Sequence, residues 1–206
     1  RLKPDAGAVV FDGKILTGRS PHDINQLGVA RVFQTPEIFS DLSVLDNVMI
    51  PALAKRDGAF AIDAWKAMYS EHDLRDKADA AIEDVGLGDH RMQEAGSLSR
   101  GDKRRLELAM CLVQDPRLLL FDEPESGVDL EHVIAVGEAI GRIVRSPDGP
   151  GRARSGLVIT HTGLILNHVD ADVGHIMKGG RILFSGDPKQ IFAHIQTNGY
   201  TAPKAA

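Results

Sequence analysis

Several residue types are scarce in this chain of 206 residues, and each scarcity excludes a class of protein. The single cysteine, Cys111, rules out an internal disulfide and a zinc site with several cysteine ligands, and it fits a reducing cytosol. Aromatic residues make up only 5%, so a core must consist mainly of aliphatic side chains. No apolar run approaches the roughly 18–20 residues that span a bilayer. The formal net charge of −5 argues against a free-standing nucleic-acid-binding protein, which normally carries clustered basic residues.

The remaining composition, 43% hydrophobic and 26% charged, is typical of a folded globular protein. Short apolar runs at residues 118–121 and 157–160 predict strands that are covered on both faces of a parallel sheet. Residues 8–16 and 174–185 predict two hairpins, because in each a glycine-containing turn separates two runs of β-forming residues.

Helical periodicity predicts the other elements. Apolar stripes favour helices over residues 74–85 and 106–113. A further helix is expected from about Leu130 with Asp129 as its cap, and a last one starts at Pro188. The basic run at residues 103–105 is interpreted as a solvated helix face.

The order of these elements predicts an α/β fold that is interrupted once. Residues 1–54 and 111–206 alternate strands and helices and are expected to form the core. Residues 55–110 are nearly all helical in pattern and are expected to form an inserted helical lobe.

Two adjacent acids, Asp122 and Glu123, follow the apolar run at residues 118–121. Open α/β sheets bind their ligands at the carboxyl ends of the strands. One acid can hold Mg²⁺, which needs few carboxylates, and the next can act on a water as a general base. From these residues alone, a strand end with two solvated acids is an equally good interpretation.

Four other positions carry groups suited to a phosphate or to a metal-bound water. Ser99 and Gly101 open a predicted helix, where free backbone amides attract anions, although an ordinary helix cap is the simpler interpretation of this motif alone. His161 follows the second buried run and can donate to a phosphate, and the amide of Gln34 suits a metal-bound water. Taken singly, a structural histidine and a solvated glutamine are the more common cases.

The order and spacing of these positions make the sequence resemble the ATP-binding-cassette (ABC) ATPases over essentially its whole length. Gln34 falls at the Q-loop of that family, 65 residues before Ser99 in the signature motif. The acids follow 23 residues later, with residues 118–122 at Walker B and Glu123 at the catalytic glutamate. The D-loop positions then match Ser126, Gly127 and Asp129, and the switch histidine matches His161.

The resemblance implies an ABC-type P-loop NTPase core with the helical lobe inserted, and it implies ATP and Mg²⁺ as ligands. Asp122 and Gln34 would contact the metal, Glu123 would activate water, and His161 would stabilise the leaving phosphate. Members of the family form head-to-tail dimers, in which the signature residues bind the nucleotide of the second subunit. The Q-loop and the helical lobe contact membrane permease subunits, which places the protein on the cytoplasmic face of the membrane.

The sequence departs from the family pattern in two ways. The signature reads Leu-Ser-Arg-Gly-Asp in place of Leu-Ser-Gly-Gly-Gln. No G-x-x-x-x-G-K-[ST] phosphate loop (Walker A) occurs in the 206 residues; the resemblance places it upstream of residues 8–16, in a segment that the sequence lacks. We therefore expect this chain alone to hydrolyse no ATP measurably.

Two branches of the family and one unrelated class of function remain open. Residues 27–48 and 104–109 look like the ATPases of branched-chain amino-acid importers. Residues 125–129, 160–162 and the segments that follow are more similar to the soluble ATPase of iron–sulfur cluster assembly. A non-catalytic interaction module is the third alternative. We favour the importer, because the Q-loop and helical regions are those that touch a membrane partner in the family.

Overall fold

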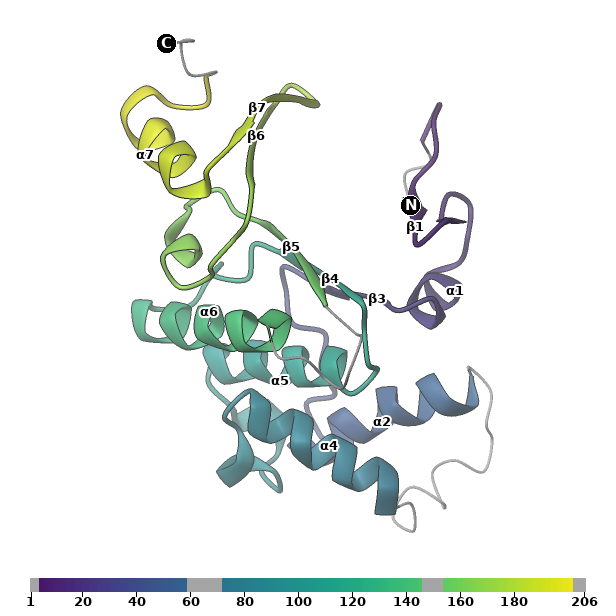
Figure 1. Cartoon of the computed structure of the whole chain (residues 1–206). Coiled ribbons are helices and arrows are strands. Elements are labelled where there is room, and N and C mark those ends of the chain that lie inside the picture. The colour runs from purple at the N-terminus through teal and green to yellow at the C-terminus, as the bar shows by residue number, and fades with distance from the viewer. Residues whose placement is uncertain (1–3, 59–71, 146–153, 202–206) are drawn as a thin grey trace.

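The computed structural model describes residues 4–58, 72–145 and 154–201 (Figure 1). Seven strands and a set of α- and 3₁₀-helices (η) occupy this part of the chain. In chain order they are β1 (Val10–Phe11), β2 (Lys14–Ile15), α1 (Pro21–Gln26), β3 (Val29–Val32), α2 (Val44–Asp57), α4 (His72–Asp84), η2 (Gly88–His90), η3 (Ala95–Ser97), α5 (Arg100–Leu112), β4 (Leu118–Asp122), α6 (Leu130–Arg145), β5 (Ser155–Ile159), η4 (Leu164–Asn167), β6 (Gly174–Lys178), β7 (Arg181–Gly186) and α7 (Pro188–Asn198).

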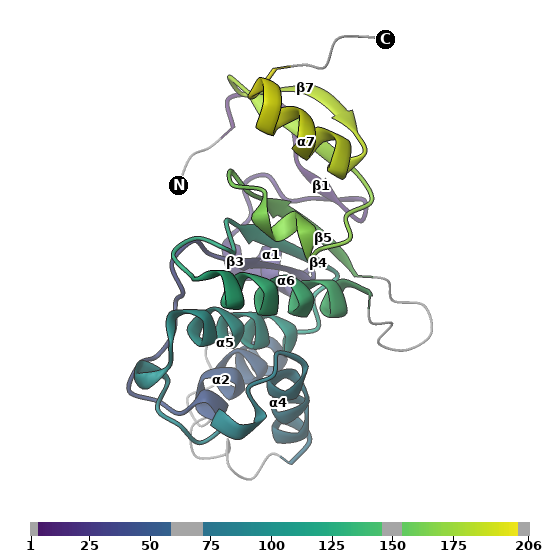
Figure 2. The ribbon, with the colours of Figure 1, turned by 90° about the vertical axis from the view of Figure 1, so that its left-hand side faces the viewer.

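A parallel sheet in the order β3-β4-β5 forms the centre of the molecule. The connection from β3 to β4 runs through α2, α4 and α5, and the connection from β4 to β5 runs through α6. Figure 2 shows the resulting layers: α6 and α5 lie under one face of the sheet, and α2 and α4 lie beyond them. The α/β fold with an inserted helical region is therefore confirmed.

One hydrophobic core joins the sheet to these helices. It includes Val32 and Phe121 on the strands, Leu106 on α5 and Ile140 on α6, all of which are buried. Because aromatic residues are scarce, aliphatic side chains fill most of this core, as the composition predicts.

The prediction that both apolar runs are covered on two faces is wrong for β5. Its residue Val158 packs against the core, but Leu157 and Ile159 point away from it and are 51% and 55% exposed. Helices α5 and α6 both pack on a single face of the sheet, so alternate residues of β5 are left open in the part of the chain that the structure describes.

The helical region begins earlier than the sequence pattern indicates. Helix α2 starts at Val44, where the hydroxyl of Ser43 accepts a hydrogen bond of 3.0 Å from the Asp46 amide and caps the first turn. Helix α2 then packs on α4 and α5. The predicted boundary at residues 54/55 therefore falls inside α2, and the boundary at 110/111 falls inside α5. The division into domains itself remains a prediction.

Both predicted hairpins are present, as is the predicted last helix. Strands β1 and β2 are joined by Asp12 and Gly13, which both have positive φ, at 49° and 72°, as a tight hairpin turn requires. Strands β6 and β7 pair in the same antiparallel way, with an irregularity near Met177. Helix α7 is capped by the side chain of Asp187.

The one cysteine is poorly suited to act as a nucleophile. Cys111 is buried on α5, and burial raises the pKa of its thiol to about 12. The thiolate, which is the reactive form, is therefore nearly absent at neutral pH. Among the described residues, no helix combines the length and the apolar character that crossing a membrane requires.

Candidate nucleotide site

The sheet topology places three of the predicted site residues at one edge. In the parallel register, Val32 of β3 pairs with Phe121 of β4, and Asp122 of β4 pairs with Ile159 of β5. The segments that leave the carboxyl ends of these strands therefore start side by side. They carry Gln34, Glu123 and His161.

Glu123 connects these three segments through its carboxylate. One oxygen, Oε1, lies 3.0 Å from Nδ1 of His161, and the other, Oε2, accepts a hydrogen bond of 3.0 Å from the Gln34 amide. Residues 89 positions apart in the chain are thus in direct contact. A carboxylate contacted at both oxygens keeps one orientation, which a general base requires.

The backbone at Glu123 is also unusual. Its φ is +49°, in the left-handed region that residues other than glycine seldom adopt. The Glu123 amide donates to the carbonyl of Ile159, and the Glu123 carbonyl accepts from the Ser126 amide, both at 2.9 Å. These bonds hold the chain in a sharp turn directly after β4. Local backbone strain of this kind is concentrated at functional sites.

Asp122 does not join the Glu123 cluster but pairs with a cation on the neighbouring strand. Nη2 of Arg31 lies 2.6 Å from Oδ2 of Asp122. The two side chains are 51% and 31% exposed, so the pair is near the surface and is screened by solvent. Asp122 Oδ1 makes no hydrogen bond or ion pair to another described residue, so it remains available as a ligand.

A buried ion pair on α5 fixes the backbone that carries Gln34. Arg104 is 1% exposed and pairs with Glu107 at 2.7 Å. The Arg104 guanidinium donates to the carbonyls of Phe33 and Gln34, and Glu107 accepts from the Phe33 amide at 2.8 Å. Burial raises the pKa of Glu107 despite these bonds. The expectation that residues 103–105 form a solvated helix face is therefore wrong for Arg104, whose buried guanidinium bonds to Glu107 and to two backbone carbonyls.

The predicted signature residues, Ser99 and Gly101, lie in a second cluster at the start of α5. The Ser99 hydroxyl caps this helix by accepting from the Asp102 amide at 3.1 Å, and it also lies 3.2 Å from Nε2 of His132. Gly101 packs against the same imidazole so closely that a Cβ on Gly101 would lie 1.8 Å from the His132 ring. Asp129 holds the other ring nitrogen at 2.8 Å, and hydrogen bonding from His132 lowers the pKa of Asp129.

The predicted D-loop residues border both clusters. Ser126 donates its amide to Glu123, while the carbonyl of Gly127 accepts a hydrogen bond of 3.3 Å from Arg100 on α5. The structure thus brings Gln34, Glu123 and His161 together, and it places Ser99, Gly101 and Asp129 around His132. The described contacts do not join the two groups except through the loop at residues 124–128.

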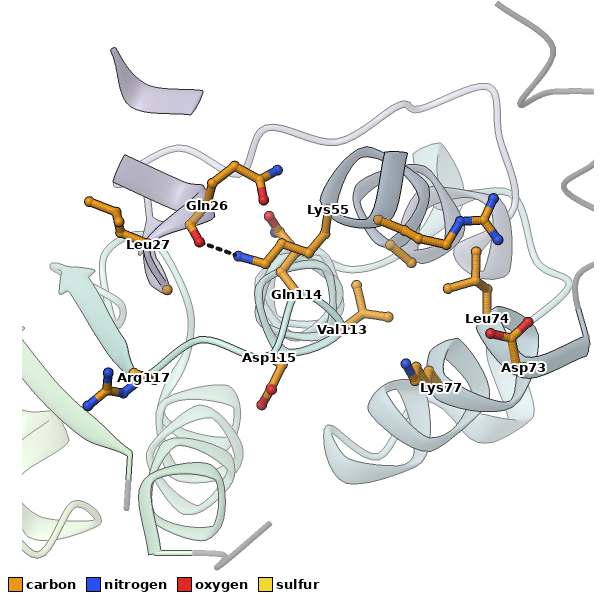
Figure 3. Close-up of a pocket in the computed structure, with 13 residues that line it drawn as sticks. Gln26, Leu27, Lys55, Asp73, Leu74, Lys77, Val113, Gln114, Asp115 and Arg117 are labelled. Carbon is orange, nitrogen blue, oxygen red and sulfur yellow. Dashed lines mark hydrogen bonds between the residues drawn. The ribbon is translucent and has the colours of Figure 1, made fainter. Parts of the chain in front are cut away.

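A cavity of about 450 Å³ lies away from both clusters. It opens beside Gly28 and Arg117, which precede β3 and β4, whereas Glu123 follows the carboxyl end of β4. Figure 3 shows Lys55 reaching across it to the carbonyl of Gln26, at 3.2 Å. Burial lowers the pKa of this lysine. We assign the cavity no part in the site, because it lies at the opposite ends of the strands.

The sequence of this chain matches a family model described as "ABC transporter" over residues 1–126, which is more than half of its length. The chain belongs to the ABC transporter family. A curated ABC relative, the high-affinity branched-chain amino acid transport ATP-binding protein LivG of Escherichia coli K12, is 27% identical over 192 residues, which cover 92% of this chain and 73% of LivG. The probable LivG of Archaeoglobus fulgidus is 33% identical over 127 residues, 62% of this chain and 49% of that protein.

Solved structures of ABC cassettes agree with the fold. A nucleotide-free ATP-binding cassette from an ABC transporter superposes with a TM-score of 0.75 at 24% identity, covering 97% of this chain and 77% of that one. The chain therefore has the ABC-type P-loop NTPase fold that the motifs predict. At this identity the likeness concerns the fold only, and the roles of individual residues depend on the geometry described above.

Sequence reasoning missed three residues that hold the clusters together. Arg31 was not singled out and Arg104 was interpreted only as part of a solvated helix face, although both are cations next to predicted site residues in the fold. Glu125 was not singled out either, although it is an acid directly after the Asp122-Glu123-Pro124 run and is buried. The signal that could have identified Glu125 is the presence of a third acid so close to the end of an apolar strand.

Proposed function

We propose that this chain is the ATP-hydrolysing subunit of an ABC transporter, and that the transporter is an importer of the branched-chain amino-acid type. The importer assignment draws on the E. coli and A. fulgidus relatives, which are named as branched-chain amino acid transport ATP-binding proteins. The observation that carries the catalytic part is the contact of Glu123 with both Gln34 and His161, each at 3.0 Å. Three segments far apart in the sequence supply the base, the amide and the imidazole that phosphoanhydride hydrolysis needs.

In this proposal Glu123 is the general base. Its carboxylate accepts the proton of the water that attacks the terminal phosphoryl group. His161, which is 61% exposed, extends its other ring nitrogen to donate to the phosphate oxygens. Gln34 fixes the orientation of Glu123, and Arg104 and Glu107 hold Gln34 in turn by its backbone.

The residues present fit a magnesium ion bound together with the nucleotide. Among the described residues, no group of three or more His, Cys, Asp or Glu forms a protein-only metal site. Mg²⁺ does not require one, because it commonly takes one or two protein oxygens plus phosphate and water. Asp122, through its open Oδ1, and the Gln34 side-chain oxygen would hold it. Bound there, the ion would neutralise charge on the phosphate oxygens.

The second cluster has a separate role in the proposal. Ser99 and Gly101 open α5 with backbone amides and a positive helix end, and this combination suits a phosphate. They do not touch the Glu123 cluster, so we propose that they bind the nucleotide of a second subunit in a head-to-tail dimer. Of the proposed D-loop residues, Ser126 and Gly127 lie between the two clusters and Asp129 contacts His132 in the second, and all three would face that subunit.

Besides the second ATPase subunit, the proposed partner is a membrane permease, which places the subunit on the cytoplasmic face of the membrane. The test is purification of the tagged full-length protein from detergent-solubilised native membranes, with identification of what accompanies it. We expect an integral membrane protein with several spanning helices in stoichiometric amount. Recovery only in the soluble fraction with a soluble scaffold protein would contradict the importer and favour the iron–sulfur assembly branch.

A further inference from the structure

A buried acid two residues after Glu123 has no role in the proposal above. Glu125 is only 5% exposed, although it carries a carboxylate. Its Oε1 accepts hydrogen bonds from the hydroxyls of Thr160 and Thr162, the latter at 2.8 Å. Its Oε2 is buried and has no hydrogen-bond partner in the described part of the chain.

The hydroxyls bound to Glu125 are themselves acceptors from the backbone. The amide of Gly163 donates to Thr160 Oγ1 at 2.9 Å, and the amide of Leu164 donates to Thr162 Oγ1 at 3.3 Å. Two hydrogen-bonded chains, each running from an amide through a hydroxyl, therefore end on one carboxylate oxygen. Both amides lie where the segment after β5 turns into η4. Glu125 is thus the acceptor at which the hydrogen-bonded chains from the Gly163 and Leu164 amides end.

The residue between the two threonines is His161. While Thr160 and Thr162 contact Glu125, the His161 ring contacts Glu123 at 3.0 Å. Two acids that are two positions apart therefore hold a single three-residue segment at three successive side chains. Displacement of either threonine would move the imidazole between them.

The unpaired Oε2 shows that a contribution to folding stability does not explain why this position carries a glutamate. A buried carboxylate oxygen without a hydrogen bond is unfavourable, and an apolar side chain would fill the same space without that loss. What an apolar side chain cannot supply is one acceptor for two hydroxyls. The specific property of Glu125 is therefore that it accepts hydrogen bonds from both threonines of the segment that carries His161.

We propose that Glu125 is a positioning residue that sets the placement of His161 against Glu123 through Thr160 and Thr162. The proposal rests on the proposed function only where it treats His161 as catalytic. The contact that Glu125 is proposed to maintain is measurable without nucleotide, and so the test is independent of ATP hydrolysis.

The test compares Glu125→Ala and Glu125→Gln with the parent chain by nuclear magnetic resonance. Glu138→Ala is the matched control, because Glu138 is an exposed glutamate on α6. Amide exchange is followed at Gly163 and Leu164, and the ¹⁵N shift of His161 Nδ1 is assigned with His161→Gln. Glu123→Ala provides the shift of an imidazole that has lost its carboxylate partner.

In Glu125→Ala we expect exchange at Gly163 and Leu164 to be about tenfold faster or more, because local opening exposes both amides. The His161 shift should move to the value measured in Glu123→Ala. Glu125→Gln retains an acceptor oxygen and should restore both readouts, and Glu138→Ala should leave them unchanged. Unaltered exchange and an unaltered His161 shift in Glu125→Ala would overturn the proposal.

A second variant keeps the test decisive if Glu125→Ala does not fold. Thr162→Val preserves the shape of the side chain and removes one of the two hydroxyls. We expect faster exchange at Leu164 and a displaced His161 shift, with amides of buried α5 residues such as Leu106 unchanged. A His161 shift that is indifferent to Thr162→Val would overturn the proposal equally. Absence of ATP hydrolysis after a G-x-x-x-x-G-K-[ST] segment has been joined to the chain would contradict the proposed function and leave these readouts intact.

Discussion

Joining a G-x-x-x-x-G-K-[ST] segment to the N-terminus of this chain is expected to raise its affinity for ATP by about four orders of magnitude. Such a loop supplies several charge-assisted hydrogen bonds to the phosphates, each worth roughly 1.5–3 kcal/mol. Four of them contribute at least about 6 kcal/mol, which corresponds to about four decades in the dissociation constant. The segment can be taken from the E. coli relative, and titration calorimetry measures the affinity of the chain with and without it.

The matched control carries the same segment with the loop lysine replaced by alanine. This variant should recover only part of the increase in ATP affinity. The chain without the segment should show no measurable hydrolysis. Turnover of ATP by that shorter chain, removed by Glu123→Gln, would contradict the expectation, because it would mean that the described residues bind the phosphates unaided.

The second large effect concerns Glu123 in the joined chain. Glu123→Gln is expected to lower kcat by about 10²–10⁴-fold, the usual contribution of a general base, while the affinity for ATP changes little. The amide has the size of the carboxylate and can still accept from Gln34 at the position seen here, but it cannot take a proton from water. Steady-state kinetics and ATP titration measure the two quantities separately.

The control for this variant is Glu138→Gln, an identical change at an exposed position of α6, which should leave kcat unaltered. If Glu123→Gln hydrolyses ATP at the parent rate, Glu123 is not the base. A loss of ATP affinity equal to the loss of kcat would assign Glu123 to binding rather than to the chemical step.

Local patterns were sufficient for most of the fold. The Asp12-Gly13 pair predicts its hairpin because its turn tolerates positive φ at both positions, and residues 118–121 predict β4 because a short apolar run suits a sheet interior. The start of α2 was missed although Ser43 and Asp46 carry the capping signal and its buried apolar residues recur at helical spacing, since Pro51 inside the segment argues against a helix. Coverage of β5 was misjudged because sequence does not show how many layers pack on a strand.

The site was predictable as a set of residues but not as a set of contacts. Order and spacing identified Gln34, Glu123 and His161, and the parallel register explains why they meet. The ion pair that removes one Asp122 oxygen depends on Arg31 lying on the neighbouring strand, which no local pattern encodes. The burial of Arg104 likewise follows from the packing of α5 on the end of β3, a long-range contact.

The central claim is that Asp122, Glu123 and His161 face the terminal phosphoryl group of one metal-bound nucleotide. Paramagnetic broadening tests it directly, with Mn²⁺ replacing Mg²⁺ in a complex of ATP with the joined chain. A paramagnetic ion broadens the signals of nearby side chains steeply with decreasing distance. The histidine ring signals and the glutamine side-chain signals are followed as the complex is titrated.

We predict strong broadening of the His161 ring and the Gln34 amide, with His72 and His90 in the helical region unaffected. Asp122→Asn should reduce the broadening, because it weakens the metal ligand. Equal broadening of all histidines, or none at His161 when the nucleotide is fully bound, would contradict the account.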